Sequence, residues 1–429
     1  MKTKDNIATR LKKDLIMSGQ YGREPQRTVS NYSQLDPDKG VTRPTGTEAN
    51  KKVRDFCVQR MLDANLEVKI DMIGNIYGRK EGSKINDGIV MCGSHLDSVL
   101  NGGQFDGALG VFSSIEAIRR LTEEHFENER PIEVVIFTGE EGSAFGSTLL
   151  GSAVLAGKIR IDDALMQKNT NGQTLKNALE AIGYLGNFKK QLDSVDCFIE
   201  THIEQGPVLY NEGISIGIVE NIVGIAWVTV TVTGQSNHAG TTPMKMRKDA
   251  LLAAAEIVTA VNRNANEILK TRGSGLVGTV GKLVVYPNGV NIVPGKVELG
   301  IDIRDVLEEN MLIMIERTRT FMKELESRYG VAVDIKISPT HAPAHLSMDV
   351  MQIIEDSTRR CGLSFKRMNS GAGHDAQNMA TKVKTGMIFI PSVDGISHSP
   401  LEWTTWDDIE NGAAVLTQTI RTLSKLDRK

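Results

Sequence analysis

Four short apolar runs, each followed directly by a cluster of polar residues, constrain the fold of this chain more than any other feature. The runs cover 89–92, 132–137, 195–199 and 387–390, and each has the length of a buried strand. Between the first two runs, apolar residues recur at helical spacing over 108–121. Strand, helix and strand in this order predict an α/β layered sheet. In such sheets ligands bind beyond the carboxyl ends of the strands, where the polar clusters fall.

The middle of the chain follows a different pattern. Residues 225–233 and 296–303 alternate apolar and polar positions, as half-buried strands do. The six expected elements, in the order strand, helix, strand, strand, helix, strand, cover 225–233, 246–269, 276–285, 296–303, 307–329 and 331–337. This βαββαβ order predicts a ferredoxin-like sandwich.

The length of the chain indicates two domains. It has 429 residues, whereas single hydrophobic cores stop growing near roughly 250–300 residues. We therefore expect a mixed-sheet α/β catalytic domain formed by 1–221 and 339–429, with the ferredoxin-like domain inserted at 222–338.

Composition narrows the class of partner. The formal net charge is -3, so no basic field attracts nucleic acid. Charges interrupt every apolar stretch at the N-terminus, which excludes a signal-peptide core, and no run approaches the roughly 18 apolar residues of a membrane span. The cysteines have no CxxC spacing, so we expect buried thiols and a reducing, cytoplasmic setting. They are Cys57, Cys92, Cys197 and Cys361.

Histidines and carboxylates occupy the polar clusters. His95 and Asp97 follow the first apolar run, and residues i and i+2 of an extended chain point the same way. Asp97 is therefore expected to accept one ring N–H of His95 while the other ring nitrogen binds a metal. Asp106 is flanked by glycines that permit a tight turn, and its carboxylate could bridge two cations.

Two adjacent acids, Glu140 and Glu141, follow the second run. Because neighbouring carboxylates repel each other, their placement needs a reason. One division of roles gives Glu141 to a metal and leaves Glu140 as general base for a metal-bound water. His202 follows the third run and His398 follows the fourth. Imidazole and carboxylate ligands without thiolate suit zinc, and also manganese, cobalt or nickel.

Seven segments carry a resemblance to a known family. They are GSHLDSVLNGGQFDGALG, TGEEGSAFGS, THIEQGPVL, GQSNHAGTTPM, NGVNIVPG, SGAGHDA and ISHSPLEWT. Together they resemble the N-carbamoyl-L-amino-acid hydrolase and allantoate amidohydrolase family, a branch of the dizinc aminoacylase and carboxypeptidase superfamily. The resemblance runs from about residue 40 to the C-terminus, and the order and separation of the motifs fit throughout.

This resemblance implies a hydrolase of carbon–nitrogen bonds other than peptide bonds, with two divalent metal ions per subunit. His95 and His202 would hold one metal, and Glu141 and His398 would hold the other. Asp106 would bridge the two.

The resemblance also implies catalytic and substrate-binding groups. Glu140 would take a proton from the attacking water, and Asp97 would support a histidine ligand. His238 would reach an active site across a dimer and stabilise the tetrahedral oxyanion. Arg304 would grip the substrate α-carboxylate with its planar fork, and Asn291 would make a second substrate contact.

Further candidates lie in two other motifs. Gln205 is expected to bind the ureido group or the carboxylate of the substrate. Gly371 belongs to a glycine-rich loop at 370–375 that could offer backbone N–H donors, and the loop lacks the spacing of a nucleotide-binding loop. His374 in this loop is another candidate for a substrate contact. The remaining histidines lack a motif and are expected to be structural or at the surface: His125, His341 and His345.

The substrate stays open among allantoate, N-carbamoyl-L-amino acids, ureidoglycine and N-carbamoyl-β-alanine, because all would use the shared motifs. A dipeptidase, aminopeptidase or aminoacylase of the wider superfamily would keep the metals and change the bond, although THIEQG and SGAGHDA are closer to the carbamoylase branch. A catalytically silent binding protein would be expected to lose ligands or the base, which are all present. The resemblance also implies a homodimer through the inserted domain.

Overall fold

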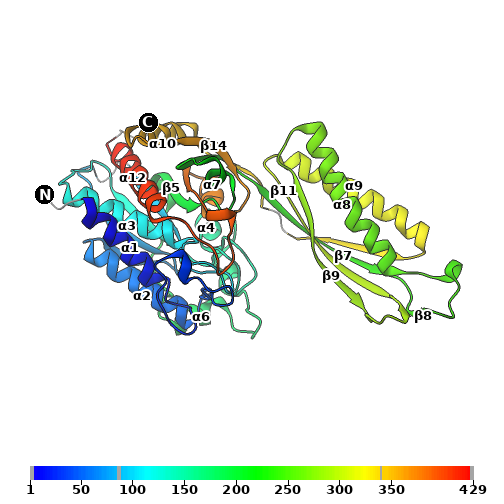
Figure 1. The fold of residues 1–429 in the computed structure, drawn as a ribbon. Helices are drawn as coiled ribbons and strands as arrows, with labels where there is room; N and C mark the ends of the chain where they lie inside the picture. Colours follow the sequence, from blue (N-terminus) through cyan, green and yellow to red (C-terminus); the bar gives the residue numbers. More distant parts are fainter. Residues whose placement is uncertain (1–3, 85–87, 339–340, 426–429) are drawn as a thin grey trace. The chain divides into compact units, whose positions relative to one another are not determined.

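The computed structural model describes residues 4–84, 88–338 and 341–425, which divide into two compact units (Figure 1). The first unit comprises Met1–Glu220 and His345–Lys429, and the second comprises Asn221–Ala344. The second unit thus extends beyond 338, the end expected for the insertion. The reason is backbone pairing, because the N–H groups of Ile225 and His341 each donate to the other residue's carbonyl at 2.9 and 3.0 Å.

A mixed sheet of nine strands forms the centre of the first unit. Four neighbouring strands are parallel, namely β4 (Ile132–Phe137), β3 (Ile89–His95), β5 (Val195–Ile203) and β15 (Lys384–Ile390). They are the four strands predicted from the apolar runs, although three of them are longer than the runs. Their carboxyl ends meet at one edge of the sheet, so the polar clusters gather there.

The other strands complete the sheet on both sides, and β2 and β6 run antiparallel to the parallel strands. Their bounds are β1 (Glu67–Ile70), β2 (Ile76–Lys80), β6 (Ile216–Ile222), β13 (Ala344–His345) and β14 (Phe365–Ser370). The mixed α/β architecture is therefore as expected.

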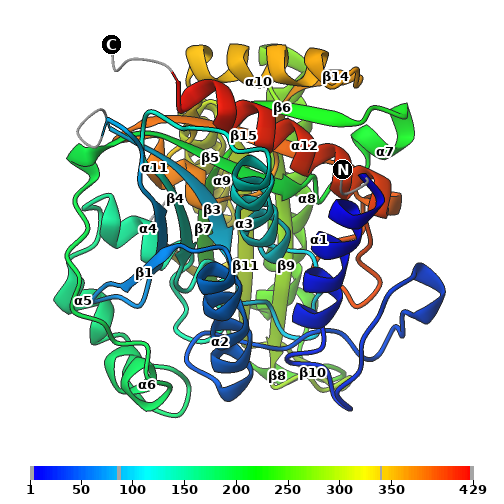
Figure 2. The same cartoon turned by 90° about the vertical axis from the view of Figure 1, so that its left-hand side faces the viewer.

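Helices cover both faces of this sheet (Figure 2). The apolar core on one face joins Ile388 and Ile390 of β15 to α3 (Ala108–Glu123), α10 (Met348–Arg360) and α12 (Trp406–Leu423). On the other face, the ring of Phe389 contacts His374 at the start of α11 at 5.6 Å between centroids. The remaining helices are α1 (Lys4–Ser18), α2 (Glu48–Asp63), α4 (Leu150–Leu155), α5 (Ile161–Leu165), α6 (Leu175–Ala181), α7 (Val208–Glu212) and α11 (Asp375–Met379).

The second unit is a ferredoxin-like sandwich with its own core. Its antiparallel sheet has the strand order β12–β7–β11–β9, with the two helices in the predicted βαββαβ succession. The bounds are β7 (Gly224–Thr233), α8 (Ala250–Arg272), β9 (Val277–Tyr286), β11 (Lys296–Asp305), α9 (Glu308–Tyr329) and β12 (Ala332–Ile337). Two short strands, β8 (Asn237–His238) and β10 (Ile292–Val293), pair separately.

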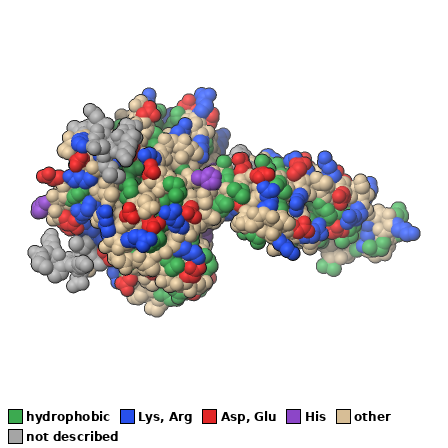
Figure 3. Space-filling view, turned by 90° about the horizontal axis from the view of Figure 1, so that it is seen from above, with side chains coloured by type: hydrophobic (Ala, Val, Ile, Leu, Met, Phe, Trp, Pro, Cys, Tyr) green, Lys and Arg blue, Asp and Glu red, His purple; other side chains and the backbone are tan. Residues whose placement is uncertain are grey.

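The charges at the surface and the environment of the cysteines can be compared with what the composition predicts. Side chains of both charge signs are interspersed over the face in Figure 3. Within the described ranges, no helix combines the length and hydropathy that crossing a bilayer requires. Three of the four free cysteines are buried, and burial raises the pKa of Cys92 and Cys197 to about 12.

The start of α8 differs from the prediction, which placed it at residue 246. The helix begins at Ala250, because the carboxylate of Asp249 accepts the N–H groups of Leu251 and Leu252 at 3.0 and 3.1 Å. Asp249 is thus an N-cap that satisfies two otherwise unpaired helix donors. The residues just before this cap also have a composition typical of helices. A prediction from composition therefore places the start of the helix too early.

Replacing Asp249 with Ala should lower the free energy of unfolding of α8 by about 1 kcal/mol, because two N–H donors lose their acceptor. Hydrogen exchange of the α8 amides, followed by mass spectrometry, measures this change. Asp334→Ala, an exposed carboxylate of β12, is the matched control. Unchanged exchange in Asp249→Ala would show that the cap does not stabilise the helix.

Candidate metal centre and substrate-binding residues

The parallel strand ends bring His95, His202 and Asp106 together. His95 is the last residue of β3, and His202 lies within β5, not in the loop after it. The Nε2 atoms of His95 and His202 lie 3.5 and 3.1 Å from Oδ1 of Asp106. All three side chains are buried, and their donor atoms lie within 4.8 Å of one another. This group can hold a cation through two imidazoles and one carboxylate.

A second group of donors shares Asp106. Its Oδ2 atom lies 3.3 Å from Nε2 of His398, which lies 3.5 Å from Oε2 of Glu141. The side chain of His398 is 52% exposed, so this group opens to solvent while the first is enclosed. Asp106 therefore directs one oxygen toward each group, which is the geometry of a bridging carboxylate.

The two buried histidines present lone pairs to this cluster. Nδ1 of His95 donates to the carbonyl of Asp97 at 3.1 Å, and Nδ1 of His202 donates to the carbonyl of Ile203 at 2.9 Å. Because a carbonyl can only accept, the neutral rings carry their proton on Nδ1 and leave Nε2 unprotonated. Among the described residues, Nε2 of His95 has no hydrogen-bond partner.

This donor set fits a divalent metal. A cation would complete a buried ring nitrogen that faces two carboxylates and lacks a partner. Although burial lowers the pKa of His95, Glu140 and Asp106 raise it well above its ordinary value, so positive charge is favoured at this position. Imidazole nitrogen and carboxylate oxygen without sulfur suit Zn²⁺, and also Mn²⁺, Co²⁺ or Ni²⁺.

The pKa values of the adjacent acids shift in the opposite direction from that of Asp106. Burial raises the pKa of Glu141 to about 8, with Asp106 adding to the rise. Burial also raises the pKa of Glu140 well above its ordinary value, and Glu141 adds to it while His95 opposes it. The pKa of Asp106 is well below its ordinary range, since the effect of the three histidines around it outweighs its burial. Oε2 of Glu140 lies 3.5 Å from Nε2 of His95, so this carboxyl group stands beside the first donor group.

The predicted bond between the His95 ring and the Asp97 carboxylate is wrong. Nδ1 of His95 lies 3.9 Å from that carboxylate and instead bonds the Asp97 carbonyl. Strand β3 ends at His95, so the two-residue alternation does not continue to Asp97. The carboxylate accepts the backbone N–H groups of Glu140 and Glu141 at 3.3 and 3.2 Å. Asp97 therefore supports the segment that carries both acids.

Glu402 is a residue beside the donor cluster that the sequence analysis did not identify. Its Oε1 accepts the N–H groups of Phe105 and Asp106 at 3.3 and 3.2 Å, and its Oε2 accepts the Ser397 hydroxyl at 2.8 Å. A Cβ at Gly103 would lie 2.0 Å from Glu402, so this close approach requires glycine. Glu402 thus ties the Asp106 loop to the segment that leads to His398. The only sequence signal was its place in the motif ISHSPLEWT.

Gln205 lies inside the cluster. Its side-chain amide donates to Oδ2 of Asp106 at 2.9 Å and contacts the Ser397 hydroxyl and Nε2 of His398 at 3.3 Å each. Its backbone adopts a left-handed conformation with φ of 57°, which is costly for a residue with a side chain and is typical of functional sites. A substrate group that contacts Gln205 would therefore also lie beside Asp106.

A third group, Glu200, His202 and His374, lies behind the first. It suits a cation poorly, because both oxygens of Glu200 already accept hydrogen bonds, from the Ser94 hydroxyl at 2.7 Å and the Ala376 N–H at 2.9 Å. Burial, with His202 close by, lowers the pKa of His374 well below its ordinary value, so this ring is neutral. Its ring packs against His202 at 4.6 Å between centroids. His374 therefore supports a metal-ligand candidate.

Gly371 lies on the exposed turn before His374. The hydroxyl of Ser370 accepts the Ala372 N–H at 3.1 Å and also contacts Nε2 of His374 at 3.0 Å. The turn thus links the surface to the buried His374, and its role in substrate binding stays a prediction.

The second unit places His238 and Asn291 side by side. Strands β8 and β10 pair with His238 opposite Ile292, and the N–H of Ala239 donates to the carbonyl of Asn291 at 2.9 Å. Both predicted side chains are exposed. One short ladder therefore carries both residues at neighbouring positions.

Arg304 is held by a carboxylate of its own strand. Its Nε and Nη2 atoms donate to the two oxygens of Asp302 at 2.9 and 3.1 Å. The indole N–H of Trp227 donates to the same carboxylate at 2.8 Å. Asp302 thus fixes the plane of the guanidinium.

His238 and Arg304 lie at opposite ends of the inserted sheet. Lys296 begins β11 and pairs with Thr233, the last residue before the segment that carries His238. A strand rises about 3.3 Å per residue, so the path from Lys296 to Arg304 covers about 26 Å. Figure 1 shows β8 beyond the end of β7.

The three other histidines stay outside the described donor groups. His125 and His345 are exposed, and His341 pairs through its backbone with Ile225. This agrees with the expectation of surface or structural roles.

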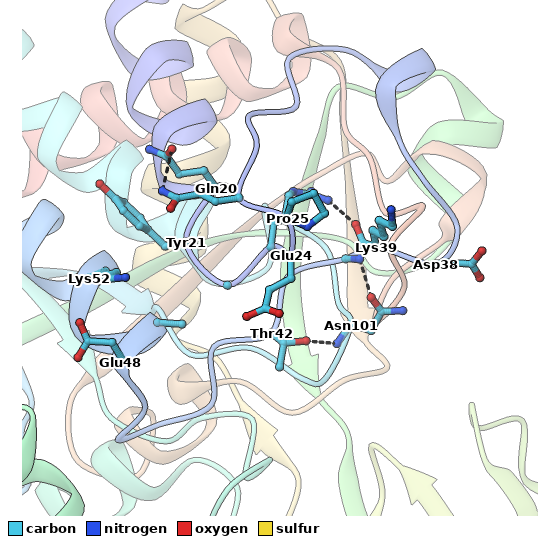
Figure 4. Close-up of a pocket in the computed structure, with 15 residues that line it drawn as sticks. Gln20, Tyr21, Glu24, Pro25, Asp38, Lys39, Thr42, Glu48, Lys52 and Asn101 are labelled. Carbon is cyan, nitrogen blue, oxygen red and sulfur yellow. Dashed lines mark hydrogen bonds between the residues drawn. The ribbon is translucent and has the colours of Figure 1, made fainter.

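An open cavity of about 750 Å³ also lies in the first unit (Figure 4). Its wall includes Asn101, whose side chain accepts the Gly40 N–H and whose own N–H donates to the Thr42 hydroxyl. None of the predicted site residues lines it, and its charged side chains carry both signs. It is therefore separate from the metal-ligand candidates.

Comparison with known proteins agrees with the motifs. Residues 91–422 match Peptidase family M20/M25/M40. The chain is 38% identical over 406 residues to the N-carbamoyl-L-amino-acid amidohydrolase of Paenarthrobacter aurescens, covering 94% of this chain and 96% of that protein. It is 36% identical over 383 residues to the allantoate amidohydrolase of Escherichia coli (strain K12), covering 89% and 92%.

A solved structure of a related protein has the same fold. The crystal structure of an amidase of the hydantoinase/carbamoylase family from Burkholderia multivorans superposes with a TM-score of 0.88 at 34% identity, covering 98% of both chains. The resemblance inferred from the motifs is thus confirmed, and the chain belongs to Peptidase family M20/M25/M40.

Proposed function

We propose that this protein is a metal-dependent amidohydrolase that cleaves the carbon–nitrogen bond of an N-carbamoyl-L-amino acid or a related ureido acid such as allantoate. The observation that carries the proposal is Asp106, which directs one oxygen toward each of two histidine-containing donor groups. The activities named for the relatives support the choice of bond. The cysteine pattern supports a reducing, cytoplasmic setting.

Two divalent ions per subunit, with zinc as the first choice, fit the donors best. His95 and His202 would hold one, Glu141 and His398 the other, and Asp106 both. When bound, such ions supply Lewis acidity that polarises the scissile carbonyl and lowers the pKa of water.

Glu140 would move the proton. Its buried carboxylate stands 3.5 Å from Nε2 of His95, at the edge of the donor cluster. A carboxylate with a raised pKa accepts a proton from the attacking water more readily than an exposed one, and it can return that proton to the departing nitrogen. An N-carbamoyl substrate would release an amino acid, carbon dioxide and ammonia.

The remaining residues would bind and orient the substrate. Arg304 would grip its α-carboxylate, because a planar guanidinium fixed by Asp302 is suited to bidentate contact. His238 would donate to the developing oxyanion. The other proposed substrate contacts are Gln205, Asn291 and Gly371.

The proposed roles of His238 and Arg304 require two copies of the chain. The ends of the sheet that carry them are separated by about 26 Å. An N-carbamoyl amino acid is about two residues long and spans only about 7 Å. Both side chains can act on one substrate only if they come from different subunits, so we propose a homodimer with shared active sites, formed through the inserted domain.

Metal removal tests the proposed reaction. Chelator-treated protein should release no ammonia from allantoate, N-carbamoyl-L-amino acids or N-carbamoyl-β-alanine, because the carbonyl is no longer polarised. Zinc, manganese or cobalt, resupplied separately, should restore release from one of these substrates. The assay measures ammonia, with N-acetyl amino acids and dipeptides scored for product amine as the comparison.

Two results would contradict the proposal. Amine release from acetyl or peptide substrates alone would assign the protein to another branch of the superfamily. Bound metal without hydrolysis of any substrate would indicate a binding protein.

Glu140→Gln should retain metal and lose activity, because the amide cannot accept the proton. We expect kcat to fall by about 10²–10⁴-fold. Metal content by mass spectrometry and kcat on the identified substrate are the two measurements. Glu127→Gln, an exposed acid of the same unit, is the control, and a near-normal kcat in Glu140→Gln would exclude this residue as the base.

Mixed dimers test the shared site. His238→Asn and Arg304→Ala homodimers should each be nearly inactive, whereas a heterodimer has one site with both residues intact. Co-expression in equal amounts should restore about a quarter of wild-type activity, since half of the dimers are mixed and each has one intact site. Activity per subunit of the mixture is the measurement, and the tag-purified heterodimer should show about half of the wild-type value. If both residues served the site from one subunit, every site in the mixture would carry a defect and no activity would return.

A further inference from the structure

The turn that carries His238 determines which ring nitrogen holds the proton. Nδ1 of His238 accepts the backbone N–H groups of Gly240 at 2.9 Å and Thr241 at 3.2 Å. A backbone N–H can only donate, so Nδ1 must present its lone pair. The neutral ring therefore carries its proton on Nε2, which is available as a donor.

Arg247 closes this turn from outside. Its Nε donates to the carbonyl of Thr242 at 3.1 Å, and its Nη2 donates to the carbonyl of Ala239 at 2.6 Å. Thr242 in turn donates its N–H and its hydroxyl to the carbonyl of His238, at 3.2 and 2.7 Å. Arg247 thus contacts both ends of the segment that supplies the two donors to the His238 ring.

The space beside the ring is also limited. A Cβ at Gly240 would lie 3.2 Å from Cε1 of His238, tighter than an ordinary contact, and 3.5 Å from its Nδ1. Gly240 does not adopt a left-handed conformation, so its backbone does not require glycine. The contact with the ring is therefore the reason that a side chain would disturb this position.

We propose that Arg247 is a positioning residue that keeps the 239–242 turn closed, so that His238 is held as a neutral Nε2–H donor. This rests on the proposed function, in which His238 donates to the oxyanion. A neutral donor suits that role, because an imidazolium would also attract the substrate carboxylate in the ground state, and such binding does not raise kcat. The turn thus favours a neutral donor, whose hydrogen bond strengthens as negative charge develops on the oxyanion.

Kinetics of Arg247→Met give the first test. We expect kcat to fall by up to about 100-fold with little change in KM, because the donor is displaced while the carboxylate clamp is kept. Arg247→Lys should retain only part of the activity, because an ammonium cannot bond both carbonyls as the planar guanidinium does. Lys245→Met is the matched control, as it removes the same charge from an exposed side chain of the same segment.

Ring ¹⁵N spectra of the full-length protein, labelled on histidine, give the second test. Comparison with His238→Asn assigns the signal. Wild type should show the proton on Nε2 of His238, and Arg247→Met should show a mixture of both tautomers. Gly240→Ala should give the same spectral change and a similar loss of kcat.

Two results would overturn the proposal. One is a wild-type ring with its proton on Nδ1, or on both nitrogens, at neutral pH. The other is Arg247→Met with wild-type kcat and an unchanged Nε2–H signal. If Arg247→Met does not fold, as judged by circular dichroism, Arg247→Lys and Gly240→Ala decide between these outcomes. If no substrate is hydrolysed, the proposed function fails, and the spectra alone still decide the role of Arg247.

Discussion

The donor cluster of the first unit depends on the contacts of the Asp106 carboxylate. Its two oxygens face three histidines that come from β3, β5 and the segment after β15. Buried charges of one sign are costly unless opposite charge balances them, and a cation between these donors would supply that charge. Glu402 holds the backbone of Asp106 in place through two N–H bonds. A change in this loop would therefore move the oxygens that face all three histidines.

The sequence predicts this arrangement well where the pattern is local. The apolar runs that form β3, β4, β5 and β15 are buried on both faces, so their composition marks them as strands. Parallel strands place their carboxyl ends together, so polar residues that follow the runs must gather. For this reason His95, Glu141, His202 and His398 could be grouped from spacing and type before any contact was known. Their division between two cations came from the resemblance.

Contacts between distant segments could not be predicted in the same way. Asp97 bonds the backbone of Glu140 and Glu141, because β3 ends two residues earlier than simple alternation assumes. Glu402 contacts a loop almost 300 positions away. Even the nearby contacts of Arg247, five and eight positions away, are with backbone carbonyls. Backbone carbonyls and N–H groups are the same for every residue type. A sequence pattern therefore contains no signal for which of them a side chain will meet.

The inserted sheet adds a constraint that the first unit does not have. Strand β11 is hydrogen-bonded on both sides, to β7 and to β9, so its length is rigid. The ends of β11 therefore stay about 26 Å apart. Within one subunit, the donor proposed for the oxyanion and the guanidinium proposed for the carboxylate therefore cannot converge through local rearrangement. Assembly of two chains is the remaining way to bring both to a substrate of this size, and it would make the geometry of the active site a property of the dimer interface.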